Sequence, residues 1–263
     1  MMNKPNIKAI FVDIDWTLYD HKHHCFDYKS IKALKKAQEN GVLIILSTAR
    51  IIHTCNELGI FKEMTPDGGI YSNGIVLLYK NEPIYTHTIS KQNCLLVQDA
   101  ILKYNLNAEF CGPDEKFLIG ENLKDVLIQF EYFKEEMPII KKYTNETITS
   151  IELFGTKEFD EALKKDLPKD FHIFRFTDHA CDINNVEALK GDGVKRMLEY
   201  LKISPDEAMA IGDDDVDISM FDSVKYSVAM GNAPDRIKKH AKYVTYKIHH
   251  HGIKHALKHF KII

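Results

Sequence analysis

Two aspartates, Asp13 and Asp15, stand one residue apart directly after the apolar segment 7–12. A continuous apolar segment of this length is typical of a buried strand, and in an extended chain residues i and i+2 point to the same side. We therefore expect the two carboxylates to converge just beyond the strand. Because like charges held that close repel each other, the site needs a cation, or one carboxylate must take up a proton. Such a pair suits a nucleophile, an acid or a metal ligand; the alternative is a strand that ends in an acidic turn.

Polar side chains follow two more apolar segments of the chain. Thr48 comes after segment 42–46, and Asp213 comes after segment 208–211. Ligands of open parallel sheets bind outside the carboxyl ends of the strands. If these segments are parallel strands of one sheet, Asp13, Thr48 and Asp213 all lie at that edge. The sequence therefore predicts a site that combines acids with a hydroxyl group.

The elements that carry these residues alternate between strands and helices. Apolar runs, helical periodicity and stop signals such as Gly41 predict them. The expected strands are residues 7–12, 42–46, 208–211, 226–230 and 243–246, and the expected helices are residues 30–40, a segment ending near 58, 190–201 and 234–240. This alternation favours βαβ units and an α/β fold with a doubly wound parallel sheet. The pair Asn73-Gly74 among apolar residues adds short antiparallel strands.

The middle of the chain has a different pattern. Its expected helices and strands are residues 92–104, 123–134, 149–154 and 172–177. No linker rich in Gly or Ser and no internal repeat marks it off, and the βα pattern resumes after it. We therefore predict an inserted α+β domain at residues 88–180, within a core made of residues 1–87 and 181–263.

Composition excludes several classes of protein. A net charge of −3 over 263 residues gives no bulk attraction to nucleic acid or anionic lipid. No apolar stretch approaches the ~20 residues of a membrane span, and the N-terminus lacks the apolar core of a secretory signal. The five cysteines are odd in number and form no C-x-x-C pair, which suits free thiols in a reducing compartment. We expect a cytoplasmic monomer or small homo-oligomer with no nucleic-acid or membrane partner.

Five short motifs, in this order, give the chain a family resemblance. They are DIDWT at residues 13–17, STAR at 47–50, KG at 190–191, GDDDVD at 212–217 and MGNA at 230–233. The chain resembles the haloacid dehalogenase superfamily of phosphotransferases, and most of all its Cof-type sugar-phosphatase branch with an α/β cap of the C2 type. The similarity covers nearly the whole chain, although the cap offers few motifs. It implies a Rossmann-like core with an inserted cap domain.

The resemblance also implies roles for individual residues. It implies a phosphatase that acts on a small phosphorylated metabolite, with sugar phosphates as the leading class. Asp13 would be the nucleophile that forms an aspartyl-phosphate, and Asp15 would be the general acid and then the general base. Thr48 and Lys190 would bind the phosphoryl oxygens. The cofactor would be Mg²⁺, held by Asp13, the Asp15 backbone carbonyl, Asp213 and, through water, Asp217.

Three residues depart from the family motifs. Trp16 and Ala49 each replace a glycine, and Val216 replaces an asparagine. Glycine at the first position helps the chain turn near the phosphate, so the indole of Trp16 is expected to reshape the entrance. None of the three changes removes a group that bonds to phosphorus or to the metal, so activity is expected to survive. The alternative is a non-catalytic or weakly catalytic protein that binds a phosphorylated metabolite as a sensor or regulatory subunit.

Other polar residues near the motifs have alternative interpretations. Arg50 can contact substrate, but we expect it to pair with a nearby acid. Thr48 can also cap the helix that follows it, and Lys190 alone can be a surface lysine at a helix start. The residues His251, His255 and His259 share one helical face by their i,i+4 spacing, an arrangement that can bind transition metals. The alternative for these histidines is a solvated helix face.

Overall fold

The computed structural model describes residues 5–113, 115–133, 136–185 and 189–263. The chain divides into two compact units, of which unit 1 comprises Met1–Tyr85 and Ala188–Ile263 and unit 2 comprises Thr86–Glu187. None of the described helices has the length and apolar character needed to cross a membrane.

Unit 1 is built on an eight-stranded sheet with the order β15-β14-β13-β1-β4-β5-β6-β7. The neighbours from β15 to β5 pair in parallel, and β5 and β6 pair antiparallel. The strands are β1 (Ala9–Val12), β4 (Leu43–Ser47), β5 (Gly68–Tyr71), β6 (Val76–Tyr79), β7 (Glu82–Thr86), β13 (Ala208–Gly212), β14 (Tyr226–Ala229) and β15 (Tyr243–Val244). The chain moves outward from β1 in one direction through β4 and β5, and in the other through β13 to β15. The order therefore reverses at β1, where ligands of such sheets bind.

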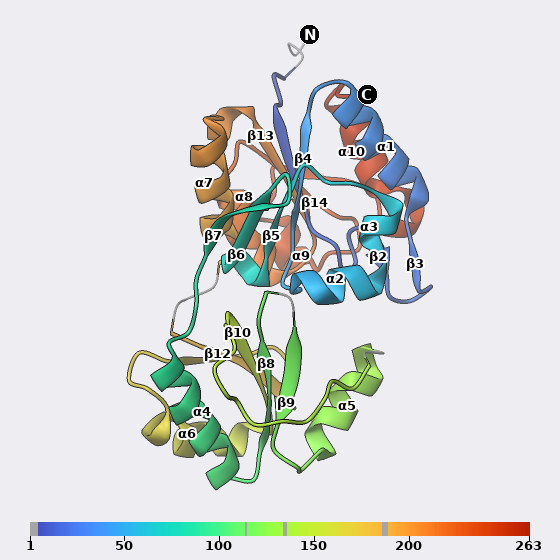
Figure 1. The fold of residues 1–263 in the computed structure, drawn as a ribbon. Helices are drawn as coiled ribbons and strands as arrows, with labels where there is room; N and C mark the ends of the chain where they lie inside the picture. The colour runs from blue at the N-terminus through green and yellow to red at the C-terminus, as the bar shows by residue number, and fades with distance from the viewer. Residues whose placement is uncertain (1–4, 114, 134–135, 186–188) are drawn as a thin grey trace. The chain divides into compact units, whose positions relative to one another are not determined.

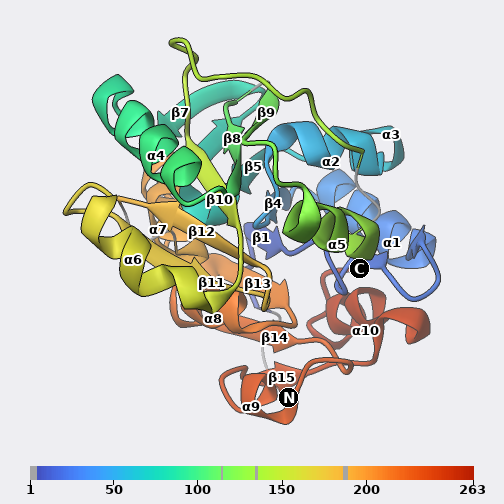
Figure 2. The ribbon, with the colours of Figure 1, turned by 90° about the horizontal axis from the view of Figure 1, so that it is seen from below.

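Helices cover both faces of this sheet (Figures 1 and 2). On one face lie α1 (Tyr28–Glu39) and α10 (Gly252–His259), and on the other lie α7 (Lys190–Leu201) and α8 (Ile218–Asp222). Shorter elements of the unit are β2 (Tyr19–Asp20), β3 (Cys25–Phe26), α2 (Ile52–Leu58), α3 (Ile60–Glu63), α9 (Asp235–Lys238), η1 (Ser72–Gly74), η3 (Pro205–Glu207), η4 (Asp215–Asp217) and η5 (Ile248–His250). The arrangement confirms the predicted doubly wound α/β sheet.

The apolar pattern of the sequence explains why these elements form. Every residue of β1 and of β13 is buried, as expected for central parallel strands that are covered on both faces. Asp27 is the N-cap of helix α1, and its side chain accepts a hydrogen bond from the backbone N–H of Ser30. The buried face of α1 includes Ile31 and Leu34. Each fully buried side chain of this size stabilises the fold by about 1.5–3 kcal/mol.

Unit 2 has an antiparallel five-stranded sheet with the order β11-β12-β10-β8-β9. Its strands are β8 (Asn107–Cys111), β9 (Lys116–Ile119), β10 (Ser150–Phe154), β11 (His172–Arg175) and β12 (Ala180–Asn184). Its helices are α4 (Lys91–Lys103), α5 (Lys124–Phe133), α6 (Asp160–Asp166) and η2 (Lys157–Phe159). One apolar cluster joins α4 and α6 to one face of the sheet, and a smaller one joins α5 to the other face.

The second boundary of the inserted segment differs from the predicted one. The prediction ended the insertion at residue 180, but β12 begins there and pairs with β10 and β11 of unit 2. A boundary at 180 would separate a strand from its sheet. Unit 2 therefore extends to Glu187, and the next element of unit 1 is α7.

We expect a change of Gly191 to alanine to destabilise the core. Gly191 lies in the first turn of α7, where a Cβ atom would collide with the carbonyl oxygen of Ser219 in α8. Overpacking of this kind costs about 1–3 kcal/mol. Urea denaturation should show that loss for Gly191→Ala and a change within about 0.5 kcal/mol for Lys195→Ala, which alters an exposed residue of the same helix. Equal stabilities of the two variants would contradict the close packing of α7 on α8.

Candidate active site

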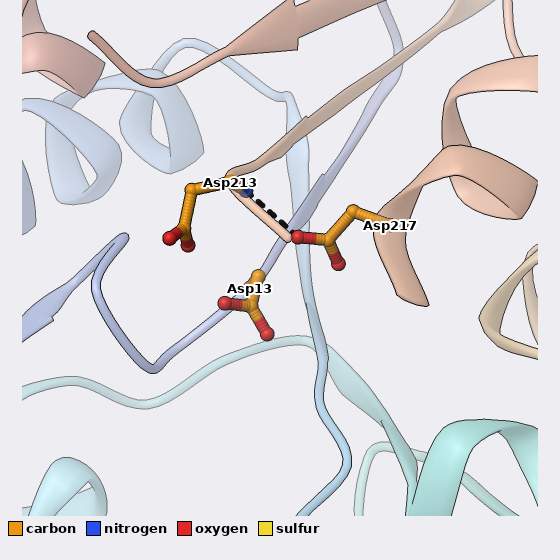
Figure 3. A group of neighbouring side chains, drawn as sticks. All are labelled: Asp13, Asp213 and Asp217. Carbon is orange, nitrogen blue, oxygen red and sulfur yellow. Dashed lines mark hydrogen bonds between the residues drawn. The ribbon is translucent and has the colours of Figure 1, made fainter. Parts of the chain in front are cut away.

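Three buried aspartates meet at the carboxyl edge of the parallel sheet (Figure 3). Asp13 follows β1, Asp213 follows β13, and Asp217 closes η4. Their carboxylate oxygens lie within 4.8 Å of one another. Since β1 and β13 are parallel neighbours, the strand ends bring Asp13 and Asp213 together as the sequence predicted. Over the described residues, these three form the only group of histidine, cysteine or acidic side chains close enough to hold a metal ion.

Lys190 is the cation that contacts this group. It is the first residue of α7, and its Nζ donates hydrogen bonds to Asp13 Oδ1 at 2.6 Å and to Asp217 Oδ1 at 2.7 Å. Only 1% of the residue is exposed, so it is not a surface lysine. Burial by itself would lower the pKa of Lys190, but the charges of Asp13 and Asp217 outweigh burial and raise that pKa.

The second oxygen of Asp217 holds the loop between β13 and η4. It accepts hydrogen bonds from the backbone N–H of Asp213 at 2.7 Å and of Asp214 at 3.1 Å, the first of which is the dashed line in Figure 3. Thr17 Oγ1 donates a hydrogen bond of 2.7 Å to Asp213 Oδ1. Thr17, in the loop after β1, thus holds the side chain of Asp213, and Asp217, in η4, holds its backbone.

The charges of the cluster do not cancel. When all four groups are ionised, the three carboxylates and the Lys190 ammonium leave two negative charges. Burial raises the pKa of Asp13 well above its usual range, and Asp217 and Asp213 act in the same direction against Lys190. Burial, followed by the charge of Asp217, raises the pKa of Asp213 to about 8. A buried set of oxygen ligands with excess negative charge fits a hard divalent cation such as Mg²⁺.

The carboxylate of Asp15 belongs to a different ion cluster. It accepts hydrogen bonds from Arg50 Nε at 2.9 Å and Arg50 Nη2 at 2.8 Å, and His21 Nε2 lies 2.6 Å from Asp15 Oδ1. Burial alone would raise the pKa of Asp15, but His21 and Arg50 hold it well below its usual range. The predicted pairing of Arg50 with an acid is confirmed.

The predicted convergence of the Asp13 and Asp15 side chains needs correction. Asp13 contacts Lys190, whereas Asp15 contacts Arg50 and His21. The rule that places residues i and i+2 on one side holds for an extended chain, and β1 ends at Val12. The two carboxylates therefore lie in neighbouring ion clusters.

Thr48 lies where the sequence placed it, but it does not cap a helix. It is fully buried after β4, and its Oγ1 accepts a hydrogen bond of 3.1 Å from the backbone N–H of Arg50. Helix α2 begins later, at Ile52, and its N-cap residue Ile51 makes no side-chain cap. The predicted capping role is therefore wrong. A role in phosphate binding stays a prediction.

The three departures from the family motifs are exposed. Trp16 is 41% exposed and Val216 is 43% exposed, and Ala49 is also exposed. The backbone of Trp16 has φ 57°, in the left-handed region that glycine adopts most readily. The turn therefore has the backbone conformation that glycine favours, although Trp16 carries an indole there.

The C-terminal histidines do not share one helical face. His251 precedes α10 with φ 60°, and its Nδ1 lies 2.8 Å from Asp27 Oδ1. The rings of His255 and His259 pack against Tyr246 and Tyr243, with centroid distances of 4.3 Å and 4.1 Å. The spacing argument fails because His251 lies outside the helix.

Sequence reasoning missed the contacts of His21 and Thr17. His21 reaches Asp15 because the chain turns back between them, where the backbone N–H of Tyr19 donates to the carbonyl oxygen of Ile14 and that of Trp16 donates to the carbonyl oxygen of Tyr19. The available signal was the group of polar residues that follows the first motif. Thr17 belongs to that motif, but its contact with Asp213 depends on the pairing of β1 with β13, which is distant in sequence.

A doubly wound sheet with a carboxylate cluster at its carboxyl edge defines a class of α/β proteins with a site for a cation and an anionic ligand. A family model described as haloacid dehalogenase-like hydrolase matches residues 10–257. The chain belongs to this hydrolase family.

Similar proteins match the chain over nearly its whole length. Phosphatase YwpJ of Bacillus subtilis is 26% identical in an alignment of 288 positions, gaps included, that covers 96% of this chain and 99% of that protein. The solved structure of a sugar phosphatase of HAD subclass IIB is 27% identical with a TM-score of 0.79, and the match covers 97% of this chain and 100% of that one. A protein from Geobacillus kaustophilus has the same fold, with a TM-score of 0.89 at 24% identity over 98% of this chain and 100% of that one.

We expect the cost of removing Lys190 to depend on Asp13. Loss of one partner of a buried ion pair destabilises a protein by about 3–5 kcal/mol. Lys190→Met should show a loss near the lower value in urea denaturation with a chelator present. In an Asp13→Asn background the same change should cost less, because one of the two carboxylates that it leaves unpaired is already neutral. Equal costs in both backgrounds would show that the contact between Lys190 and Asp13 contributes nothing to stability.

Proposed function

We propose that this protein is a phosphatase that hydrolyses the phosphomonoester of a small metabolite, with sugar phosphates as the leading substrate class. The observation that carries the proposal is the meeting of Asp13, Asp213, Asp217 and Lys190 at the carboxyl edge of β1 and β13. The names of Phosphatase YwpJ and of the subclass IIB sugar phosphatase support it, because both proteins match the chain almost from end to end.

In the proposed first step, Asp13 attacks phosphorus. One carboxylate oxygen of Asp13 forms a bond to the phosphorus atom, the bond between phosphorus and the ester oxygen breaks, and an aspartyl-phosphate results. Lys190 holds Asp13 Oδ1 and supplies positive charge beside the phosphoryl group. The leaving oxygen takes a proton from Asp15, which acts as the general acid.

In the proposed second step, water releases phosphate. Asp15 takes a proton from the attacking water, the water oxygen bonds to phosphorus, the bond between phosphorus and Asp13 breaks, and inorganic phosphate and free Asp13 result. Arg50 and His21 stabilise the ionised form of Asp15, which suits this second step. For the first step Asp15 must carry a proton, so we propose that its contacts with these residues weaken when substrate binds.

The donor set supports Mg²⁺ as the cofactor. Asp13, the Asp15 backbone carbonyl and Asp213 would hold the ion, and Asp217 would act through water. Bound Mg²⁺ supplies positive charge that reduces the repulsion between Asp13 and an anionic substrate. Thr48, at the end of β4, is proposed to bind a phosphoryl oxygen. Unit 2 is proposed to be the cap domain that selects the leaving group.

We expect Asp13→Asn to abolish hydrolysis. Removal of a catalytic nucleophile lowers kcat by about a thousandfold or more, and the reaction can be followed with p-nitrophenyl phosphate and Mg²⁺. Asp215→Asn serves as the matched control, because Asp215 begins η4 and pairs with Arg236 on the surface; its activity should stay within twofold of the wild type.

The same assay separates the second candidate function. A regulatory protein that only binds phosphorylated metabolites is favoured by the ion pairs that keep Asp15 ionised. It predicts that wild type and Asp13→Asn are equally inactive while both bind a sugar phosphate in calorimetry. Hydrolysis by the wild type, with none by Asp13→Asn, would reject this regulatory function.

We expect the stability contribution of Asp213 to fall as pH rises. Its pKa in the folded protein is about 8 against an ordinary value of 3.8, so between these values the folded protein holds a proton that the unfolded chain has released. With a chelator present, the free energy of unfolding of the wild type should therefore fall relative to that of Asp213→Asn when the pH is raised from 5 to 8. Urea denaturation at both values measures it.

Addition of Mg²⁺ tests the cation in the same experiment. A bound divalent cation favours the ionised carboxylate and displaces the proton. Mg²⁺ should therefore raise the Tm of the wild type, more at pH 8 than at pH 5, and should have little effect on Asp213→Asn. An equal Mg²⁺ effect on both proteins would place the cation elsewhere.

A further inference from the structure

Trp16 occupies a backbone conformation that disfavours a large side chain. Its φ of 57° lies in the left-handed region, which costs a residue other than glycine about 1 kcal/mol or more. The peptide groups on both sides are held by hydrogen bonds. The Trp16 N–H donates to the carbonyl oxygen of Tyr19 at 2.8 Å, and the Trp16 carbonyl accepts from Asn232 Nδ2 at 2.9 Å.

Strain of this kind persists where the surroundings fix it, and it is concentrated at functional sites. A glycine would satisfy both backbone hydrogen bonds without strain, since neither of them involves the indole. The indole must therefore contribute something other than the turn itself.

The indole is supported on one side and open to solvent. Its ring centroid lies 5.3 Å from that of His21, and the next rings in the row are Tyr19 and Phe26, at 4.9 Å and 5.0 Å from their neighbours. Tyr19, His21 and Phe26 belong to the β2–β3 hairpin, so these contacts place the indole at the end of an aromatic row. Even so, Trp16 remains 41% exposed.

The indole of Trp16 lies beside the residue that is proposed to act as the general acid. Trp16 directly follows Asp15, the residue proposed to protonate the leaving oxygen, and His21 contacts both of them. If Asp15 protonates the leaving oxygen as proposed, we expect the group bonded to that oxygen to lie within reach of the indole, because His21 links the two side chains. Flat apolar surfaces in ligand sites orient a ligand by contact with its rings.

We propose that Trp16 is a stacking platform for the leaving group, and that this protein prefers phosphomonoesters whose leaving group contains a ring with an apolar face. Both a sugar ring and a nucleobase have such a face. The inference rests on the proposed phosphatase function and deepens it, because it names a residue that selects the substrate. Stacking of a base on an aromatic side chain contributes about 1–3 kcal/mol, which corresponds to a factor of about 5 to 150 in affinity.

Direct binding can be measured because Trp16 is the only tryptophan of the chain. Its fluorescence is recorded in the Asp13→Asn variant with Mg²⁺, while glucose 6-phosphate, adenosine 5′-monophosphate, glycerol 3-phosphate or inorganic phosphate is added. A saturable change with one or both ring compounds, and none with the acyclic ester or phosphate, is the expected result. An identical change with all four compounds, or binding of ring compounds in calorimetry without any change, would overturn the proposal.

Steady-state kinetics then test selection. The ratio of kcat/KM for the better ring ester to that for glycerol 3-phosphate should fall about tenfold in Trp16→Gly, mainly through KM, and Trp16→Phe should restore most of it. Comparison of the two ring esters shows whether a sugar or a base provides the face. Tyr28→Ala, which removes an exposed ring on α1, should leave the ratio unchanged.

A merely structural role gives a different pattern. In that case Trp16→Gly would lower kcat by the same factor for all three esters, or would leave the ratio as it is, and the proposal would be wrong. Failure of the wild type to hydrolyse any ester, including p-nitrophenyl phosphate, would instead reject the proposed phosphatase function, and the inference with it.

Discussion

Three carboxylates buried around one ammonium group are the constraint on which the rest of unit 1 depends. Asp13, Asp213 and Asp217 come from two separate parts of the chain, and Lys190 begins a helix of its own. Bringing them together requires β1 beside β13 and α7 in close contact with α8. The cluster opposes folding, because buried like charges repel and the single positive charge of Lys190 does not balance three carboxylates. A feature that costs stability and is nevertheless built by so many elements indicates function.

The two aspartates of the first motif illustrate how environment separates similar groups. Burial and neighbouring acids raise the pKa of Asp13, whereas Arg50 and His21 lower that of Asp15. The proposed mechanism needs the opposite charge states in its first step, with Asp13 ionised and Asp15 protonated. A divalent cation beside Asp13 and a substrate beside Asp15 would each act in the required direction. The protein without ligands is therefore only one of the electrostatic states in the proposed cycle.

Local patterns were sufficient for part of the structure. The helix 190–201 was predicted with its observed bounds, and Asp13, Thr48 and Asp213 lie at the strand ends where the apolar runs placed them. Apart from the local contact of His21 with Asp15, the features that were missed depend on contacts between residues distant in sequence. Antiparallel pairing assigns β12 to unit 2, and the direction of the Asp15 side chain depends on Arg50. Sequence spacing describes neither kind of contact, because each depends on how separate elements pack.

Trp16 shows what a departure from a family motif means once the backbone is known. From the sequence, loss of a glycine at a turn suggested a reshaped entrance. The observed φ of 57° shows that the turn keeps the conformation that glycine favours. The path of the chain near Asp13 and Asp15 therefore does not need to change when the side chain does. A substitution that leaves the turn in place and adds an exposed ring beside the proposed acid alters what the site can contact more than how it reacts. This separation between chemistry and recognition is why the proposed roles of Asp13 and Asp15 and the proposed substrate preference can be tested independently in this protein.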